Sequence, residues 1–204
     1  MSILKKGLIA SAALALPFAV SANSKLERMM GDPNQWVQQS GNYAGERYTE
    51  LDQINKSNVG SLKVAWTFST GVLRGHEGGP LVIGDVMYVH TAIPNIVYAL
   101  DLNDDQRIIW KYNPVKGGKY PGGETMDRVI SVMCCDNVNR GVNYHPNGTI
   151  VTHVADTSVI ALDAKTGKTK WITTNMHSGT GKYGVSASTG SGQPYIIKDT
   201  VGVG

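Results

Sequence analysis

The chain has 204 residues and a formal net charge of +3, and 41% of its residues are hydrophobic. Lys5 and Lys6 carry the only charges within residues 1–22, so the net charge falls from +3 to +1 for the rest of the chain. A balance this close to neutral argues against nucleic acid or an anionic membrane surface as a partner.

Residues 1–22 have the organisation of a secretory signal peptide. The two lysines precede an apolar run from Gly7 to Val20, and Val20-Ser21-Ala22 is a small-x-small cleavage sequence. No later segment approaches the roughly 20 apolar residues that are needed to span a bilayer. We therefore expect an exported, periplasmic protein without a membrane span, whose mature part is residues 23–204.

The next part of the chain predicts little regular structure, apart from a short helix near residues 53–59. From Leu62 onwards, short runs rich in β-forming residues alternate with Gly, Asp and Asn turns. The expected strands are 62–69, 81–83, 86–90, 97–101, 108–111, 142–144, 149–153, 159–163, 169–172, 195–197 and 200–201.

These strands form a unit that occurs twice. Each copy begins with a hairpin and ends on a tryptophan, Trp110 in the first and Trp171 in the second, while Trp66 resembles the end of a preceding unit. About 44 residues from Trp66 to Trp110 is a normal blade of a β-propeller, whereas the longer second unit indicates an insertion at residues 113–131. Such rings close with about four to eight blades. We expect an all-β fold with two to three blades of a larger propeller, and tryptophans packed between them.

The matching positions of His90 and His153 in the two copies favour a structural hydrogen-bonding role for both histidines over metal binding.

Cys134 and Cys135 are the only cysteines, and they are adjacent. A relaxed disulfide joins Cα atoms about 4.4–6.8 Å apart, whereas neighbouring Cα atoms lie about 3.8 Å apart, so a bond between them closes a strained ring. Strain of this kind is usually kept where it serves a site. Two reduced, buried thiols are the simpler interpretation for a cytosolic protein, but an oxidising compartment favours the vicinal disulfide.

Four motifs resemble the pyrroloquinoline quinone (PQQ)-dependent alcohol dehydrogenases, and most closely the large subunits of methanol dehydrogenases. They are Trp36 with 41–48 and 51–55, the segment 66–78, the repeat 161–168 with Trp171, and the block from Cys134 to Gly141. The likeness covers residues 35–204. The sequence at residues 72–77 and 132–136 resembles that of the lanthanide-using branch.

This resemblance implies the N-terminal part of an eight-bladed propeller in a periplasmic enzyme. The implied reaction is oxidation of methanol or another primary alcohol to the aldehyde, with PQQ and a calcium or lanthanide ion as cofactors. Electrons then pass to a c-type cytochrome, and a homodimer is compatible with the family. No position of the chain matches the family's catalytic aspartate or metal ligands, so we expect a fragment that has no dehydrogenase activity alone.

The resemblance also assigns cofactor-binding residues. Cys134 and Cys135 would form a disulfide that lies flat against the quinone ring. Glu77 matches a glutamate that hydrogen-bonds the cofactor, and the guanidinium of Arg140 suits a quinone oxygen or carboxylate. A hydroxyl from Thr189 or Ser191 is the remaining candidate, and the choice between them stays open.

Two other interpretations compete with this one. A non-catalytic periplasmic propeller scaffold would share the repeat seen at 161–168 with Trp171, but it needs neither the cysteine pair nor Glu77. A broken or incomplete gene, whose product never folds, is the other.

Overall fold

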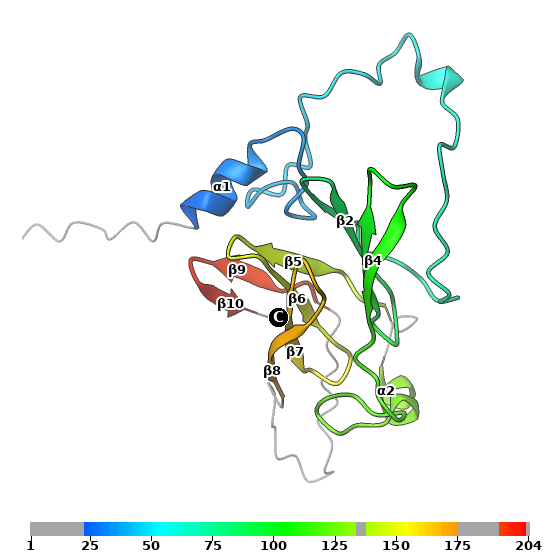
Figure 1. Cartoon of the computed structure of the whole chain (residues 1–204), viewed down its shortest axis with the longest axis vertical. Helices are drawn as coiled ribbons and strands as arrows, with labels where there is room; N and C mark the ends of the chain where they lie inside the picture. The colour runs from blue at the N-terminus through cyan, green and yellow to red at the C-terminus, as the bar shows by residue number, and fades with distance from the viewer. Residues whose placement is uncertain (1–22, 134–137, 175–191, 203–204) are drawn as a thin grey trace, which may run out of the picture.

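The computed structural model describes residues 23–133, 138–174 and 192–202. Two four-stranded antiparallel sheets and a terminal hairpin make up its β-structure (Figure 1). The first sheet contains β1 (Leu81–Ile83), β2 (Val86–His90), β3 (Val97–Asp101) and β4 (Arg107–Tyr112). The second contains β5 (Val142–His145), β6 (Thr149–His153), β7 (Val159–Asp163) and β8 (Thr169–Thr173), and the hairpin contains β9 (Tyr195–Ile197) and β10 (Thr200–Gly202).

Both sheets repeat one design in detail. Strand order follows chain order in each, and each strand pairs with the next one antiparallel. His90 pairs with Val97 in the first sheet, as His153 pairs with Val159 in the second. A register shift follows the same alanine of the third strand in both sheets. The predicted four-stranded blade is therefore confirmed twice, down to the irregularity of its last strand pair.

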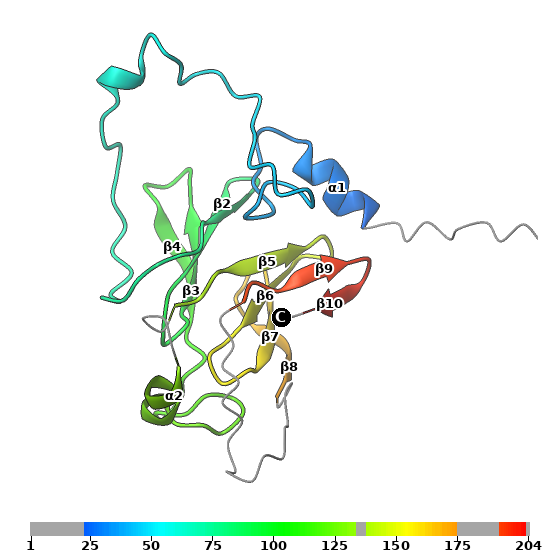
Figure 2. The same ribbon diagram turned by 180° about the vertical axis from the view of Figure 1, so that it is seen from behind.

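The prediction of a strand at 62–69 is wrong, because this stretch is extended but pairs with no strand among the described residues. A strand needs a partner for its backbone N–H and C=O groups, and periodicity alone cannot supply one. The short helix expected at 53–59 is instead one 3₁₀ turn, η1, at Val59–Ser61. Figure 2 shows the segment looping out from the sheets and back, and its end returns to the first sheet, where Phe68 packs against Tyr98.

Trp110 packs between the two sheets, as predicted. Its Nε1–H donates to the carbonyl of Ala164 at 2.9 Å, and the Tyr88 hydroxyl donates to the same oxygen at 3.1 Å. Gly167 lies directly against the indole ring. For Trp66 and Trp171 the packing prediction is wrong in this structure, since they are 39% and 41% exposed. Every residue of β8 is exposed, because no described sheet covers it.

The N-terminal segment ties the first sheet to the terminal hairpin. Helix α1 (Ser24–Met30) buries Leu26 completely in the core and is capped by Asn23, whose side-chain oxygen accepts from the Leu26 N–H. Trp36 then exchanges two backbone hydrogen bonds with Val82 of β1. Further along, the Tyr43 hydroxyl donates to the carbonyl of Ile196 in β9 at 2.6 Å.

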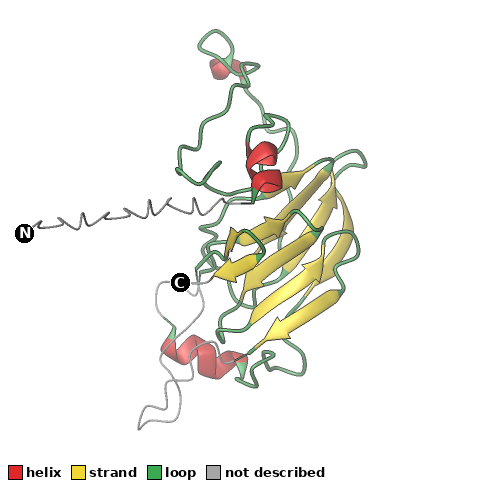
Figure 3. Cartoon of the chain, turned by 90° about the vertical axis from the view of Figure 1, so that its left-hand side faces the viewer, coloured by secondary structure: helices red, strands yellow, loops and turns green. Residues whose placement is uncertain are grey.

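The insertion predicted after the first unit contains a helix that the sequence did not predict, α2 (Met126–Val132). Figure 3 shows it beyond the ends of the strands, on the opposite side from α1. The Tyr120 hydroxyl donates to the Asn95 side chain, and the Gly122 N–H donates to Asp156. The insertion is thus attached to the loops of both sheets. In the described part of the chain, no helix is long and apolar enough to cross a membrane.

The contact between Gly167 and Trp110 gives a stability prediction. A methyl group at position 167 would collide with the indole, and the positive φ of +67° also disfavours a side chain. We expect Gly167→Ala to lower the free energy of unfolding by about 3 kcal/mol. Gly148→Ala is the matched control, because its φ is +81° but nothing lies near the added methyl; about 1 kcal/mol is expected. Equal losses in urea denaturation would contradict the docking role of Gly167.

Candidate functional site

Two residues singled out in the sequence meet in the structure. Arg140 Nη2 lies 3.2 Å from Glu77 Oε2, although 62 residues separate them in the chain. Glu77 belongs to the loop before β1, and Arg140 to the loop before β5. The two side chains are about half exposed and line an open hollow. Its lining residues are Gln39, Ser40, Arg47, Glu77, Arg140, Gly192, Gln193 and Tyr195.

This hollow is rich in hydrogen-bond donors. Arg47 and Arg140 contribute two guanidinium groups, which bind carboxylates through paired N–H donors. The buried Nε2 of Gln39 has no hydrogen-bond partner among the described residues. Its amide lies directly against Gly141, where a Cβ atom would collide with it. The two guanidinium groups fit an anion that carries several carboxylates.

Buried contacts hold the loop that carries Arg140. Asn139 is 1% exposed, and its Nδ2 donates to the carbonyl of His153 at 2.8 Å. Its Oδ1 accepts from the Gly141 N–H at 2.8 Å. The backbone carbonyl of Asn139 lies 3.0 Å from Nε2 of His90. The predicted structural hydrogen-bonding role of His90 is therefore confirmed.

The protonation of His90 follows from its surroundings. Burial lowers the pKa of His90 to about 4, although the hydrogen bond to Asn139 opposes this shift; repulsion from His76 lowers the pKa further, by less. The imidazole is therefore neutral near pH 7. Because a carbonyl oxygen can only accept, Nε2 carries the proton and donates it to Asn139.

The other predicted site residues lie outside the described residues. These are Cys134, Cys135, Thr189 and Ser191. Gln39 and Arg47 were not singled out in the sequence, although Arg47 belongs to the resemblance motif at 41–48. His76 is exposed and bonded within its own turn, to the Arg74 carbonyl and the Thr70 hydroxyl, which agrees with a structural role.

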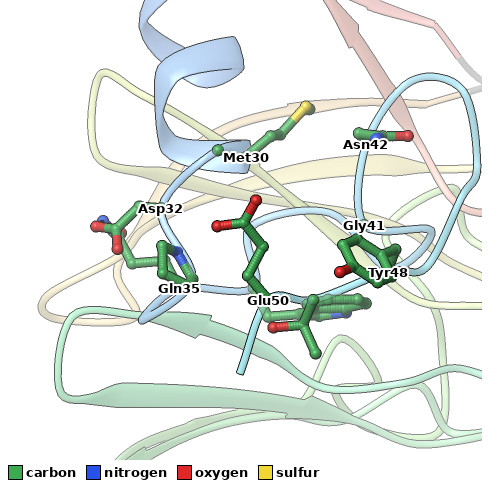
Figure 4. A pocket seen from close by; sticks show the side chains of 11 residues that line it. Met30, Asp32, Gln35, Gly41, Asn42, Tyr48 and Glu50 are labelled. Atoms are coloured by element: carbon green, nitrogen blue, oxygen red, sulfur yellow. Dashed lines mark hydrogen bonds between the residues drawn. The ribbon is translucent and has the colours of Figure 1, made fainter. Parts of the chain in front are cut away.

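A second hollow lies between α1 and the segment that follows Gly41 (Figure 4). Asp32 and Glu50 line it. Hydrogen bonds from Gln35 and Asn34 lower the pKa of Asp32, so its carboxyl stays ionised. This hollow is therefore acidic and unsuited to an anion. Within the described residues, no three His, Cys, Asp or Glu side chains gather into a metal site.

Comparisons with known proteins point in one direction. Residues 36–171 match a family model described as "PQQ: Glucose/ethanol/alcohol dehydrogenase, beta-propeller domain". A lanthanide-dependent methanol dehydrogenase of Methylorubrum extorquens is 48% identical over 193 residues, which are 95% of this chain and 30% of that protein. Subunit 1 of a methanol dehydrogenase (cytochrome c) of Paracoccus denitrificans is 42% identical over 90% of this chain and 28% of its own length.

Solved structures agree with these sequence comparisons. A europium-containing methanol dehydrogenase superimposes with a TM-score of 0.76 and 45% identity, covering 89% of this chain and 29% of that one. A quinohemoprotein alcohol dehydrogenase from Comamonas testosteroni gives a TM-score of 0.74 at 31% identity, over 89% of this chain and 25% of its own. This chain thus spans about 30% of the length of the relatives it matches.

The buried, neutral His90 makes stability depend on pH. Its pKa is about 4 in the folded protein and about 6.5 when unfolded, so the unfolded chain binds more protons between these values. Stability should therefore fall by about 3 kcal/mol as the pH drops from 6.5 to 4. His90→Gln should remove most of this slope in urea denaturation. Tyr88→Phe, on the same strand, should keep the pH dependence of stability. An unchanged slope in His90→Gln would contradict the assignment of this dependence to His90.

Proposed function

Because this chain belongs to the PQQ-dependent glucose/ethanol/alcohol dehydrogenase β-propeller family, we propose that it forms part of a quinoprotein alcohol dehydrogenase. The proposed reaction is oxidation of methanol or another primary alcohol to the aldehyde. The observation that carries this proposal is the Glu77–Arg140 pair at the donor-rich hollow. Both residues belong to the motifs of the resemblance, and the donors around them suit a quinone that bears three carboxylates.

The charged residues of the hollow each have a proposed part in cofactor binding. Arg140 donates to a quinone oxygen or carboxylate, and Arg47 supplies a second positive charge. Glu77 orients Arg140 through their ion pair and hydrogen-bonds the cofactor. Gln39 lines the hollow beside Arg47 and Arg140. When bound, PQQ accepts the hydride of the alcohol, chemistry that no side chain provides.

The roles proposed for the site residues outside the described ranges rest on the resemblance to the family. Cys134 and Cys135 form a vicinal disulfide that serves as a flat wall for the quinone ring. Thr189 or Ser191 adds a hydroxyl donor. A lanthanide or calcium ion, held by family positions that this chain does not match, would supply Lewis-acid polarisation of the quinone carbonyl. The relatives' printed names, lanthanide-dependent and europium-containing, support the lanthanide.

We also propose a periplasmic location and a c-type cytochrome as electron acceptor. The signal-like residues 1–22 support the location, and the name of the Paracoccus relative includes cytochrome c. A homodimer stays a prediction. Among the described residues, no specific contact favours the scaffold alternative, which needs neither the cysteine pair nor Glu77.

Arg140→Lys tests the site in the protein as its host produces it. Lysine keeps the charge but loses the planar pair of donors, so we expect the dissociation constant for PQQ to rise about tenfold or more. Titration of the cofactor-free protein, followed by PQQ absorbance, measures this change. Arg107→Lys is the control, since Arg107 also pairs with a carboxylate, that of Asp101, but lies outside the hollow. Equal affinities in both variants would exclude Arg140 from the site.

Dye-linked oxidation tests the reaction itself. We expect residues 1–204 alone not to oxidise methanol, because no position of the chain matches the family's catalytic aspartate or metal ligands. The protein as its host produces it should oxidise methanol only after PQQ and either lanthanum or calcium have been added. Activity that does not depend on PQQ would contradict the proposed function.

A further inference from the structure

We propose that His90 is a positioning residue, which sets the separation between Glu77 and Arg140 from beneath the cofactor hollow. The proposal rests on the proposed function, since it assumes that these two side chains hold PQQ. His90 lines no part of the hollow and is 5% exposed. It acts through its two neighbours, Gly78 and Asn139.

His90 holds the Arg140 loop through Asn139. The ring donates from Nε2 to the Asn139 carbonyl at 3.0 Å, and both residues are buried. On the other side, the Asn139 side chain bonds the carbonyl of His153, the last residue of β6. The residue before Arg140 is therefore bound to the end of β2 in the first sheet and to the end of β6 in the second. A buried donor or acceptor left without its partner is costly, so this link resists displacement.

The same ring supports the Glu77 loop through Gly78. A Cβ atom at position 78 would overlap the His90 ring and would come within 2.8 Å of the Arg140 carbonyl oxygen. Gly78 thus lies against both the imidazole and the backbone of Arg140. Only a residue without a side chain can approach this closely. The His90 ring therefore packs against Gly78, next to Glu77, and its Nε2 bonds Asn139, next to Arg140.

The ion pair cannot provide this alignment by itself. Both of its side chains are about half exposed, and exposed pairs contribute only about 0–1 kcal/mol. The buried contacts below are stronger and less screened by solvent. Among the described residues, His76 is the titratable group whose charge acts on the ring. Because the ring is neutral near pH 7, its donation to Asn139 keeps one form over the working range.

The experiment compares substitutions of buried residues on one strand. His90→Leu keeps the bulk of the ring but removes the donor, whereas His90→Gln keeps an N–H. Tyr88→Phe is the control: Tyr88 is equally buried on β2, and its hydroxyl also bonds a carbonyl of the second sheet, that of Ala164. For each variant of the full protein, PQQ titration gives the dissociation constant, and circular dichroism gives Tm.

We expect His90→Leu to raise the dissociation constant for PQQ about tenfold and to shift the absorbance of the bound quinone. His90→Gln should restore affinity to within about threefold. Tyr88→Phe should lower Tm with less than about a twofold change in affinity. If His90→Leu and Tyr88→Phe bind PQQ equally well while the parent protein binds it tightly, the positioning role is wrong and the proposed function stands.

A second pair of variants tests the contact from the other side and remains informative if His90→Leu does not fold. Gly78→Ala should weaken PQQ binding about tenfold, because the methyl displaces the loop from the ring. Gly79→Ala, which has open space around the added methyl, should not. Equal affinities would overturn the proposal. A parent protein that binds no PQQ at all would instead overturn the proposed function on which it rests.

Discussion

The docking of Trp110 onto the second sheet is the interaction on which the arrangement of this structure depends. An indole N–H and a tyrosine hydroxyl share the carbonyl of Ala164, and the ring lies over Gly167. A large aromatic surface is thereby buried together with its only polar group, which is satisfied. Together with the link from His90 through Asn139 to His153, this contact holds the two sheets side by side, and the loops before β1 and β5 come together.

Much of the fold could be predicted from the sequence, because its signals are local. Gly84 and Gly148 adopt positive φ in the turns where hairpins were expected, and each strand pairs with its chain neighbour. The strand expected at 62–69 failed because the stretch has no strand partner among the described residues, which a local pattern cannot reveal. Helix α2 was missed because glycines 117, 118, 122 and 123 dominate the insertion, although Thr125 gives a capping signal three residues before Arg128.

The site was only partly predictable, for a related reason. Glu77 and Arg140 were found through their motifs, and the structure brings them together. Gln39 and Arg47 reach the same hollow from a segment whose path depends on the pairing of Trp36 with Val82, which no local pattern reveals. A structural role for His90 was predictable from the repeat, but its contact with Gly78 depends on how two distant loops pack. Long-range packing therefore determines which of these residues meet, and their spacing in the sequence does not reveal it.

The strand order of the two sheets has a consequence for folding. Neighbours in each sheet are neighbours in the chain, so each sheet can form through short loops at small entropic cost. The N-terminal segment closes much longer loops, to Val82 and, through Tyr43, to Ile196. We expect the N-terminal segment to pack after the sheets have formed. The side of the hollow that contains Gln39 and Arg47 would therefore assemble last. A quinone that binds only the fully assembled hollow would stabilise the folded state by mass action and so favour completion of this last step.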